Sequence, residues 1–335
     1  MNRISVTILI VLTLVMGVIS GCLQQQNNNI PEQTTSILKG VSLSPRSFHA
    51  TDFTDFFNKT RATGEIVSWT GDWNELSNTE NGGPVVVASL VTISSHRYVP
   101  VIEAQFFTQS NGTLLRPLNS TTKQRYENSA VAFATTFTPS YLALGVEINV
   151  LYEKSPQDFE EFVTFFGDVY TAVKAVSPET NVFTIFQLEK MKGLQDGLFG
   201  GVNNPDTAQW SLLDRFPDSD LIAFTTYPSL IYTNPSDIPS DYYTEITAHT
   251  TKPVVFTEIG WPSNTSIPGW GSNEAQQATF IPLFFNLTKE VNPEFVIWSF
   301  MYDQNTIEPF KSMGLRRDDG SAKPSWDAWT QAGQE

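Results

Sequence analysis

The chain has 335 residues, of which 40% are hydrophobic and 13% aromatic, so it can form a substantial core and is not a wholly disordered protein. Its 35 acidic and 20 basic side chains give a formal net charge of -15, which argues against nucleic acid as the main partner, because phosphate binding requires a basic surface. The single cysteine excludes an intrachain disulfide framework and a metal site with two cysteine ligands.

Residues 1–21 have the layout of a secretory signal. The cation Arg3 precedes an uncharged apolar run from Ile4 to Ile19, which is short for a bilayer span. The residues that end in Cys22 resemble the prokaryotic lipobox, in which cleavage before the cysteine frees it for lipid attachment. This resemblance implies a lipid anchor to the membrane at Cys22, and an uncleaved N-terminal anchor is the alternative. Both place the rest of the chain outside the cytoplasm, at the cell surface.

A polar tract rich in Gln and Asn follows the cysteine. Because such a sequence cannot bury apolar surface, residues 22–38 are predicted to form a flexible tether. No linker interrupts the sequence after this tract, and residues 39–333 are therefore expected to form one domain.

From about residue 40 onward, short apolar segments alternate with segments of helical periodicity. The apolar segments are rich in Val, Ile, Phe and Tyr, as buried parallel strands are. Strands are predicted at 40–44, 65–70, 99–106, 140–148, 181–187, 220–227, 252–258 and 294–301. Helices are predicted at 51–61, 84–96, 122–136, 156–176, 207–215, 238–248, 273–289 and 324–332. Eight strand–helix repeats match a (β/α)8 barrel of the TIM type in number and size.

Glutamates end two of the predicted strands. Glu147 follows the apolar residues 141–146 of the fourth strand, and Glu258 follows residues 253–257 of the seventh. In a (β/α)8 barrel the chemistry takes place at these carboxyl ends, and strands four and seven lie across the barrel mouth from each other. Two facing carboxyl groups suit cleavage of a glycosidic bond, because one attacks the anomeric carbon while the other protonates the leaving oxygen. For either glutamate alone, an ion pair with an arginine or a loop cap is the alternative.

The segment at 257–263, Thr-Glu-Ile-Gly-Trp-Pro-Ser, is similar to the nucleophile segment of the family 17 β-1,3-glucanases. With the strand layout, it resembles the large clan of retaining (β/α)8-barrel glycoside hydrolases, whose acid/base and nucleophile end strands four and seven. The resemblance implies that Glu258 is the nucleophile and Glu147 the acid/base, acting on a β-linked polysaccharide or oligosaccharide. A catalytically silent carbohydrate-binding lipoprotein on the same barrel and a transglycosylase that remodels surface glycans are the alternatives.

Other residues at the predicted strand ends are candidates for sugar contacts. The clan layout implies that Tyr227 hydrogen-bonds the nucleophile and that Trp298 forms an apolar floor under the sugar. A half-buried rim aromatic and core packing are the respective alternatives. Arg46 is a candidate to hold Glu258 ionised. With Arg46, the remaining expected substrate-binding residues are Trp69, Gln105, Asn149, Gln187 and Trp261, and ordinary loop contacts are the alternative for these weaker candidates.

One position departs from the clan. The clan usually has Asn immediately before the acid/base, where it hydrogen-bonds the sugar 2-hydroxyl, but this chain has Val146. Contacts to that hydroxyl contribute several kcal/mol to transition-state binding in glycosidases. Either another residue hydrogen-bonds the 2-hydroxyl, the preferred sugar differs, or activity is weak or lost.

The sequence predicts no metal and no cofactor. The three histidines, His49, His96 and His249, show no metal-ligand spacing. A Gly-rich phosphate loop of the Walker or dinucleotide type is also missing from the sequence.

Overall fold

The computed structural model of the protein describes residues 37–333. The predicted signal sequence, Cys22 and nearly all of the predicted tether lie outside these residues. Within residues 37–333, none of the helices combines the length and the apolar character needed to cross a membrane.

Nine parallel strands within the described part of the chain form one sheet, in the order β7-β6-β3-β2-β1-β11-β10-β9-β8. They span Leu38–Ser42 (β1), Ile66–Asp72 (β2), Val99–Gln105 (β3), Tyr141–Leu144 (β6), Asn181–Phe183 (β7), Ile185–Gln187 (β8), Ile222–Thr226 (β9), Val254–Ile259 (β10) and Phe295–Trp298 (β11). A separate antiparallel hairpin consists of β4 (Phe107–Thr108) and β5 (Thr113–Leu114).

The two strands at the ends of this order, β7 and β8, are consecutive segments separated only by Thr184. Because β7 pairs with β6 and β8 pairs with β9, one stretch of chain joins both edges of the sheet. The sheet is therefore a nearly closed barrel, in which β7 and β8 together form the fifth strand. The (β/α)8 barrel predicted from the sequence is confirmed.

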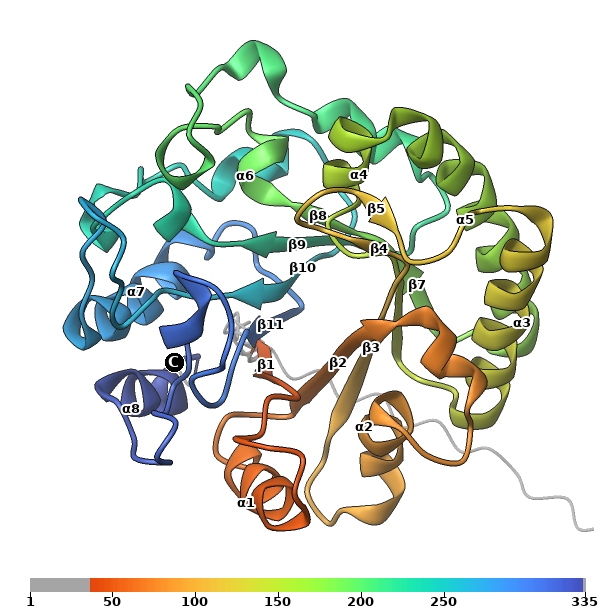
Figure 1. Ribbon diagram of the computed structural model, residues 1–335, viewed down its shortest axis with the longest axis horizontal. Helices are drawn as coiled ribbons and strands as arrows, with labels where there is room; N and C mark the ends of the chain where they lie inside the picture. The colour runs from red at the N-terminus through yellow and green to blue at the C-terminus, as the bar shows by residue number, and fades with distance from the viewer. Residues whose placement is uncertain (1–36, 334–335) are drawn as a thin grey trace, which may run out of the picture. The chain divides into compact units, whose positions relative to one another are not determined.

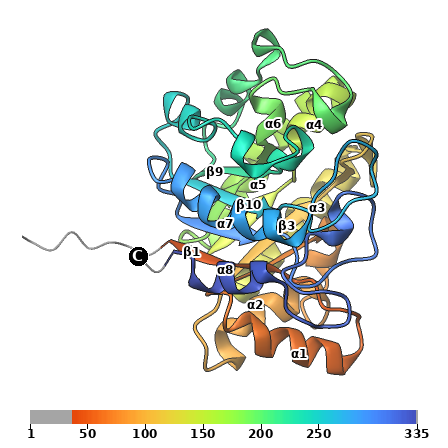
Figure 2. The ribbon, with the colours of Figure 1, turned by 90° about the vertical axis from the view of Figure 1, so that its left-hand side faces the viewer.

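Helices surround the barrel (Figure 1). They span Ala50–Thr60 (α1), Gly83–Ile93 (α2), Ser120–Phe137 (α3), Ile148–Lys154 (α4), Pro156–Val176 (α5), Leu188–Met191 (α6), Glu274–Leu287 (α7) and Pro324–Gln331 (α8). In α5, Pro156 occupies the first turn, where its missing N–H is not needed, and Phe159, Phe162 and Phe166 form a buried stripe. Helices α7 and α8 pack beside each other on one side of the barrel (Figure 2).

Successive side chains of a strand point to opposite faces, so the barrel has two apolar layers. Ile66 and Ile297 belong to the cluster inside the barrel, whereas their neighbours Val67 and Trp298 belong to the larger cluster between the barrel and the helices. This alternation decides which strand residues reach the cavity described below.

Several predicted elements differ from the structure, among them the strand predicted at 294–301, which ends at Trp298. The fourth strand ends at Leu144 rather than at residue 148, because Gly145 and Glu147 have φ angles of 93° and 55°, which a strand cannot contain. The helices predicted at 207–215 and 238–248 are 3-10 turns, Trp210–Arg215 and Thr244–Ala248.

Candidate active site

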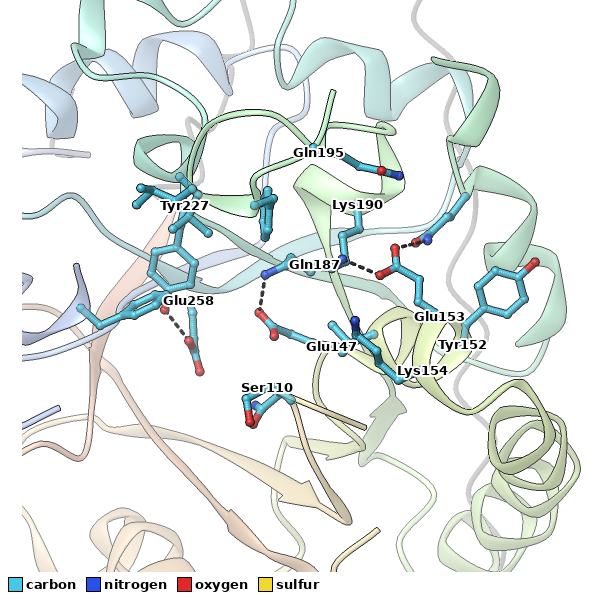
Figure 3. A pocket seen from close by; sticks show the side chains of 18 of the residues that line it. Ser110, Glu147, Tyr152, Glu153, Lys154, Gln187, Lys190, Gln195, Tyr227 and Glu258 are labelled. Atoms are coloured by element: carbon cyan, nitrogen blue, oxygen red, sulfur yellow. Dashed lines mark hydrogen bonds and ion pairs between the residues drawn. The ribbon is translucent and has the colours of Figure 1, made fainter. Parts of the chain in front are cut away.

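A cavity of about 1150 Å³ lies at the carboxyl ends of the barrel strands. Residues after β3, β6, β8, β9, β10 and β11 form its walls. Of the predicted site residues, Glu147, Gln187, Tyr227 and Glu258 line it (Figure 3). The two glutamates singled out from the sequence therefore share one cavity, at the end of the barrel where chemistry is expected.

The backbone at Glu147 is unusual. Its φ of 55° and ψ of 44° place it in the left-handed region, immediately before α4. A non-glycine residue there costs about 1–3 kcal/mol, and such strain persists only where the surroundings impose it. The side chain of Gln105 supplies part of that constraint, because its Nε2 donates to the Val146 carbonyl over 3.1 Å and its Oε1 accepts the Phe106 N–H over 3.0 Å. The turn aims Glu147 into the cavity.

The carboxyl group of Glu147 is buried and receives two hydrogen bonds. The Thr225 hydroxyl donates to Oε1 over 2.7 Å, and Gln187 Nε2 donates to the same oxygen over 3.3 Å. Burial and the repulsion from Glu258 raise the pKa of Glu147 to about 7, against the lowering effect of the Thr225 hydroxyl. Glu147 can therefore hold a proton close to neutral pH, as a general acid must.

Glu258 is the second-last residue of β10 and follows a shift in the register of β10 against β9, between Phe256 and Glu258. The Tyr227 hydroxyl donates to Glu258 Oε2 and also lies 2.8 Å from the Ser299 hydroxyl. Burial raises the pKa of Glu258, and the hydrogen bond from Tyr227 lowers it by stabilising the ionised form. Burial outweighs this hydrogen bond, so the pKa of Glu258 is raised as well; repulsion from Glu258 adds to the effect of burial on the pKa of Glu147.

Gln105 and Asn149 are buried and make hydrogen bonds within the protein instead of lining the cavity. Asn149 Nδ2 donates to the Gln187 carbonyl and to Gln209 Oε1, both over 3.0 Å, while its Oδ1 accepts the Gln187 N–H over 2.8 Å. These bonds fix Gln187 beside Glu147. Gln105 and Asn149 therefore hold neighbouring residues of the site in place and do not line the cavity themselves.

Three expected aromatic contacts also lie outside the cavity wall: Trp69, Trp261 and Trp298 belong to the buried cluster between barrel and helices. Trp298 follows the inward-facing Ile297, so its ring points outward, where it packs near Trp329 and donates from Nε1 to the Met313 carbonyl over 2.7 Å. An aromatic side chain from the same segment that does line the cavity is Phe300.

Arg46 lies in the loop after β1 and pairs with Asp52 of α1, with 2.7 Å between Nη2 and Oδ1. Its distance to the Asp55 carboxylate is 4.0 Å. Among the described residues, the Glu258 carboxyl group accepts a side-chain hydrogen bond only from Tyr227, so the tyrosine hydroxyl, and not Arg46, supports its negative charge.

Sequence reasoning missed several groups around the two carboxyls, of which Thr225 donates directly to Glu147. Glu103 interrupts the apolar strand β3, is fully buried and accepts from the Thr70 hydroxyl over 2.9 Å, and burial and repulsion from Glu258 raise its pKa. Glu189 follows the end of β8 by two residues. A charge inside or just after an apolar strand is the signal that could have found both glutamates.

Structural comparison finds many barrel proteins with the same fold. The chain is similar to a family 39 glycoside hydrolase from Bacteroides cellulosilyticus WH2, with a TM-score of 0.60, 18% identity, and coverage of 87% of this chain and 62% of that one. It is also similar to the exo-β-1,4-mannosidase Op5Man5 from Opitutaceae bacterium strain TAV5 (TM-score 0.62, 14% identity, 89% and 59% covered). For xylanase 10B from Thermotoga maritima the TM-score is 0.60, with 10% identity and coverage of 90% and 96%.

The chain spans about 60% of the length of the first two of these proteins. At such low identities the similarity establishes the barrel fold. No protein-family model and no curated protein sequence matches the chain.

Proposed function

We propose that this protein is a retaining β-glycoside hydrolase in which Glu258 is the nucleophile and Glu147 the acid/base. The observation that carries the proposal is that both carboxyl groups line one cavity at the carboxyl ends of the barrel strands. Glu147 has its pKa raised to about 7, while Glu258 accepts a hydrogen bond from Tyr227. The pKa of Glu147 is raised in part by the charge of Glu258, which is the relation expected between a general acid and an ionised nucleophile beside it.

In the first step, the Glu258 carboxylate attacks the anomeric carbon and the bond from that carbon to the leaving oxygen breaks. The proton of Glu147 passes to the leaving oxygen. Once Glu258 is esterified its negative charge is gone, so the repulsion that raises the pKa of Glu147 falls. Glu147 then removes a proton from water, whose oxygen attacks the anomeric carbon and releases Glu258.

The substrate that we propose is a β-linked polysaccharide or oligosaccharide. One wall of the cavity is apolar and includes Phe199, Phe300 and Phe310, which suit the C–H faces of sugar rings. The lining also includes polar side chains such as Gln187 and Gln209, which suit hydroxyl groups. The names of the similar structures, a mannosidase and a xylanase among them, support this substrate class.

The decisive experiment measures hydrolysis of β-1,3- and β-1,4-glucans, galactans and mannans by the wild type and by the Glu147→Gln and Glu258→Gln variants. We expect activity on at least one polymer, and a loss in both variants of about 10⁴-fold or more. Azide should rescue Glu258→Ala with an inverted product and Glu147→Ala with a retained one. Activity that survives both glutamine substitutions would refute the assignment.

One observation favours a second candidate, a carbohydrate-binding protein without turnover. Val146 is fully buried in the apolar cluster inside the barrel, so this position offers no group to the sugar 2-hydroxyl. Isothermal titration of the wild type with the same polymers distinguishes the two functions. Saturable binding by a sample that releases no reducing ends on any of them would establish the second candidate.

We also propose that the protein is anchored to the cell surface by a lipid on Cys22. The proposal rests on the sequence around this residue, which lies outside the described residues. The test compares full-length wild type and Cys22→Ser by mass spectrometry after expression in a host that processes lipoproteins. The wild type should lack residues 1–21 and carry acyl chains on Cys22, whereas the variant should carry none; a wild type without acyl chains would rule out the lipid anchor.

A further inference from the structure

Glu189 is a fully buried glutamate beside the proposed site, and no step of the proposed reaction uses it. It lies in α6, and one of its oxygens, Oε1, accepts three hydrogen bonds. The donors are the Thr226 hydroxyl at 2.8 Å, the Tyr227 N–H at 2.9 Å and the Tyr242 hydroxyl at 2.9 Å. This carboxyl group therefore fixes the end of β9 at the residue that contacts Glu258.

The segment that carries Glu189 also carries Gln187, which donates to Glu147. Figure 3 shows Gln187 and Tyr227 on the cavity wall, each next to one of the two glutamates. Through its side chains, residues 187–189 contact Glu147 directly and Glu258 by way of Tyr227. A displacement of this short segment would move both Gln187, the donor to Glu147, and Tyr227, the donor to Glu258.

We infer that Glu189 is a positioning residue of the proposed glycosidase site, which holds Tyr227 in register with Glu147 and adds a negative charge behind Glu147. The role of Glu189 in catalysis rests on the proposed function. Its structural basis is the set of three hydrogen bonds and the shared segment of chain.

The second oxygen of Glu189, Oε2, is buried and has no hydrogen-bond partner. A buried oxygen without a partner destabilises a fold, and a glutamine could have provided the single acceptor that Tyr227, Thr226 and Tyr242 use. The choice of a carboxylate at this position is explained if its charge acts on a neighbour.

The causes of the pKa shifts of Glu147 and Glu189 agree with an electrostatic effect of Glu189 on Glu147. Burial is the largest cause of the raised pKa of Glu147, followed by Glu258; Glu189 raises it further and Lys190 lowers it. Burial also raises the pKa of Glu189 itself, while its three donors favour the ionised form. The titratable side chains that interact with Glu189 from the neighbouring segment are Tyr232, Tyr242 and Tyr243.

The test uses Glu189→Gln, which keeps an oxygen acceptor but removes the charge. Losing a negative neighbour lowers the pKa of Glu147, so the basic limb of the kcat/KM profile should move to lower pH by about 0.5 units or more. Glu189→Leu removes the acceptor as well, and we expect kcat to fall about 100-fold with little change in KM, because Tyr227 loses its position.

Glu103→Gln is the matched control. Glu103 is also a fully buried glutamate, but burial raises its pKa well above the usual range and it is not among the groups that act on Glu147. The basic limb should stay in place in this variant. An unchanged basic limb in Glu189→Gln, or an equal shift in Glu103→Gln, would overturn the inference.

Carboxyl-¹³C NMR of glutamate-labelled protein gives a second readout that requires no turnover. The Glu147 resonance, assigned by its loss in Glu147→Gln, should titrate at lower pH in Glu189→Gln than in the wild type. If the wild type hydrolyses no polymer, the proposed function fails, but this titration still decides whether Glu189 acts on Glu147. Identical titrations would refute the electrostatic role even in an active enzyme.

Discussion

The hydroxyl of Tyr227 donates a hydrogen bond to Glu258 across two neighbouring strand ends, β9 and β10. Tyr227 is itself held at two points: its N–H donates to Glu189, and its hydroxyl lies next to that of Ser299. The donor that supports the proposed nucleophile is therefore fixed by backbone and side chain together, which is the preorganisation that electrostatic stabilisation in a buried site requires.

Removing this donor should weaken the nucleophile. In Tyr227→Phe, Glu258 loses the hydrogen bond that favours its ionised form, so its pKa rises and the acidic limb of the kcat/KM profile moves to higher pH. We expect kcat/KM to fall about 10- to 100-fold at the optimum, measured with the best substrate of the panel.

Tyr170→Phe is the control for this substitution. Tyr170 also donates to a carboxylate, that of Asp220, over 3.0 Å, but it lies on α5, outside the cavity wall. Kinetics equal to wild type are expected there. A Tyr227→Phe enzyme with an unshifted acidic limb would show that the hydroxyl does not support the charge of Glu258.

The raised pKa of Glu147 predicts the alkaline side of the activity profile. Glu147 must be protonated to act as the acid, and with a pKa of about 7 it loses its proton as the pH rises through neutrality. Activity should therefore fall tenfold per pH unit above about pH 7–8. A flat kcat/KM between pH 6 and pH 9 would contradict the role of this residue.

The two aromatic residues near the end of β11 should respond differently to truncation. Trp298→Ala should reduce the free energy of unfolding by about 3–5 kcal/mol, because the ring is fully buried between the barrel and the helices. Phe300→Ala should change stability far less and raise KM, because Phe300 is partly exposed and lines the cavity. Urea unfolding and steady-state kinetics of both variants test this, and a KM effect confined to Trp298→Ala would reverse the assignment.

The buried Lys323 forms an ion pair with the partly buried Asp303 in the segment between β11 and α8, and a hydrogen bond to Ser263 in the loop after β10. Lys323 Nζ donates to Asp303 Oδ1 over 2.6 Å and to Ser263 Oγ over 2.8 Å, and the lysine is almost completely buried. Lys323→Met leaves the Asp303 carboxylate without its cation, which should cost about 3–5 kcal/mol of unfolding free energy.

The matched control for this pair is Lys123→Met. Lys123 pairs with Glu161 on the outer surface of the helices, where half of the glutamate side chain is exposed. Its loss should change the unfolding free energy by less than about 1 kcal/mol. Equal destabilisation by the two substitutions in chemical unfolding would mean that burial does not strengthen the dependence of Asp303 on Lys323.

The sequence by itself determined the barrel and its two glutamates. Strands and helices follow from local patterns of apolar residues, and a carboxyl-terminal charge on an apolar strand is visible without any coordinates. For this reason Glu147 and Glu258 were found as a pair, together with Tyr227 and Gln187 at other strand ends.

Only the tertiary structure decided how these residues are used. The direction of Trp298 depends on the pleat of β11, and the aim of Glu147 depends on a left-handed turn that Gln105 stabilises from another strand. The hydrogen bonds from Thr225 to Glu147 and from Tyr227 to Glu189 join residues 78 and 38 positions apart. A local sequence pattern specifies where a strand ends, whereas the proton affinity of a carboxyl group depends on burial and on neighbours that only the closed barrel brings together.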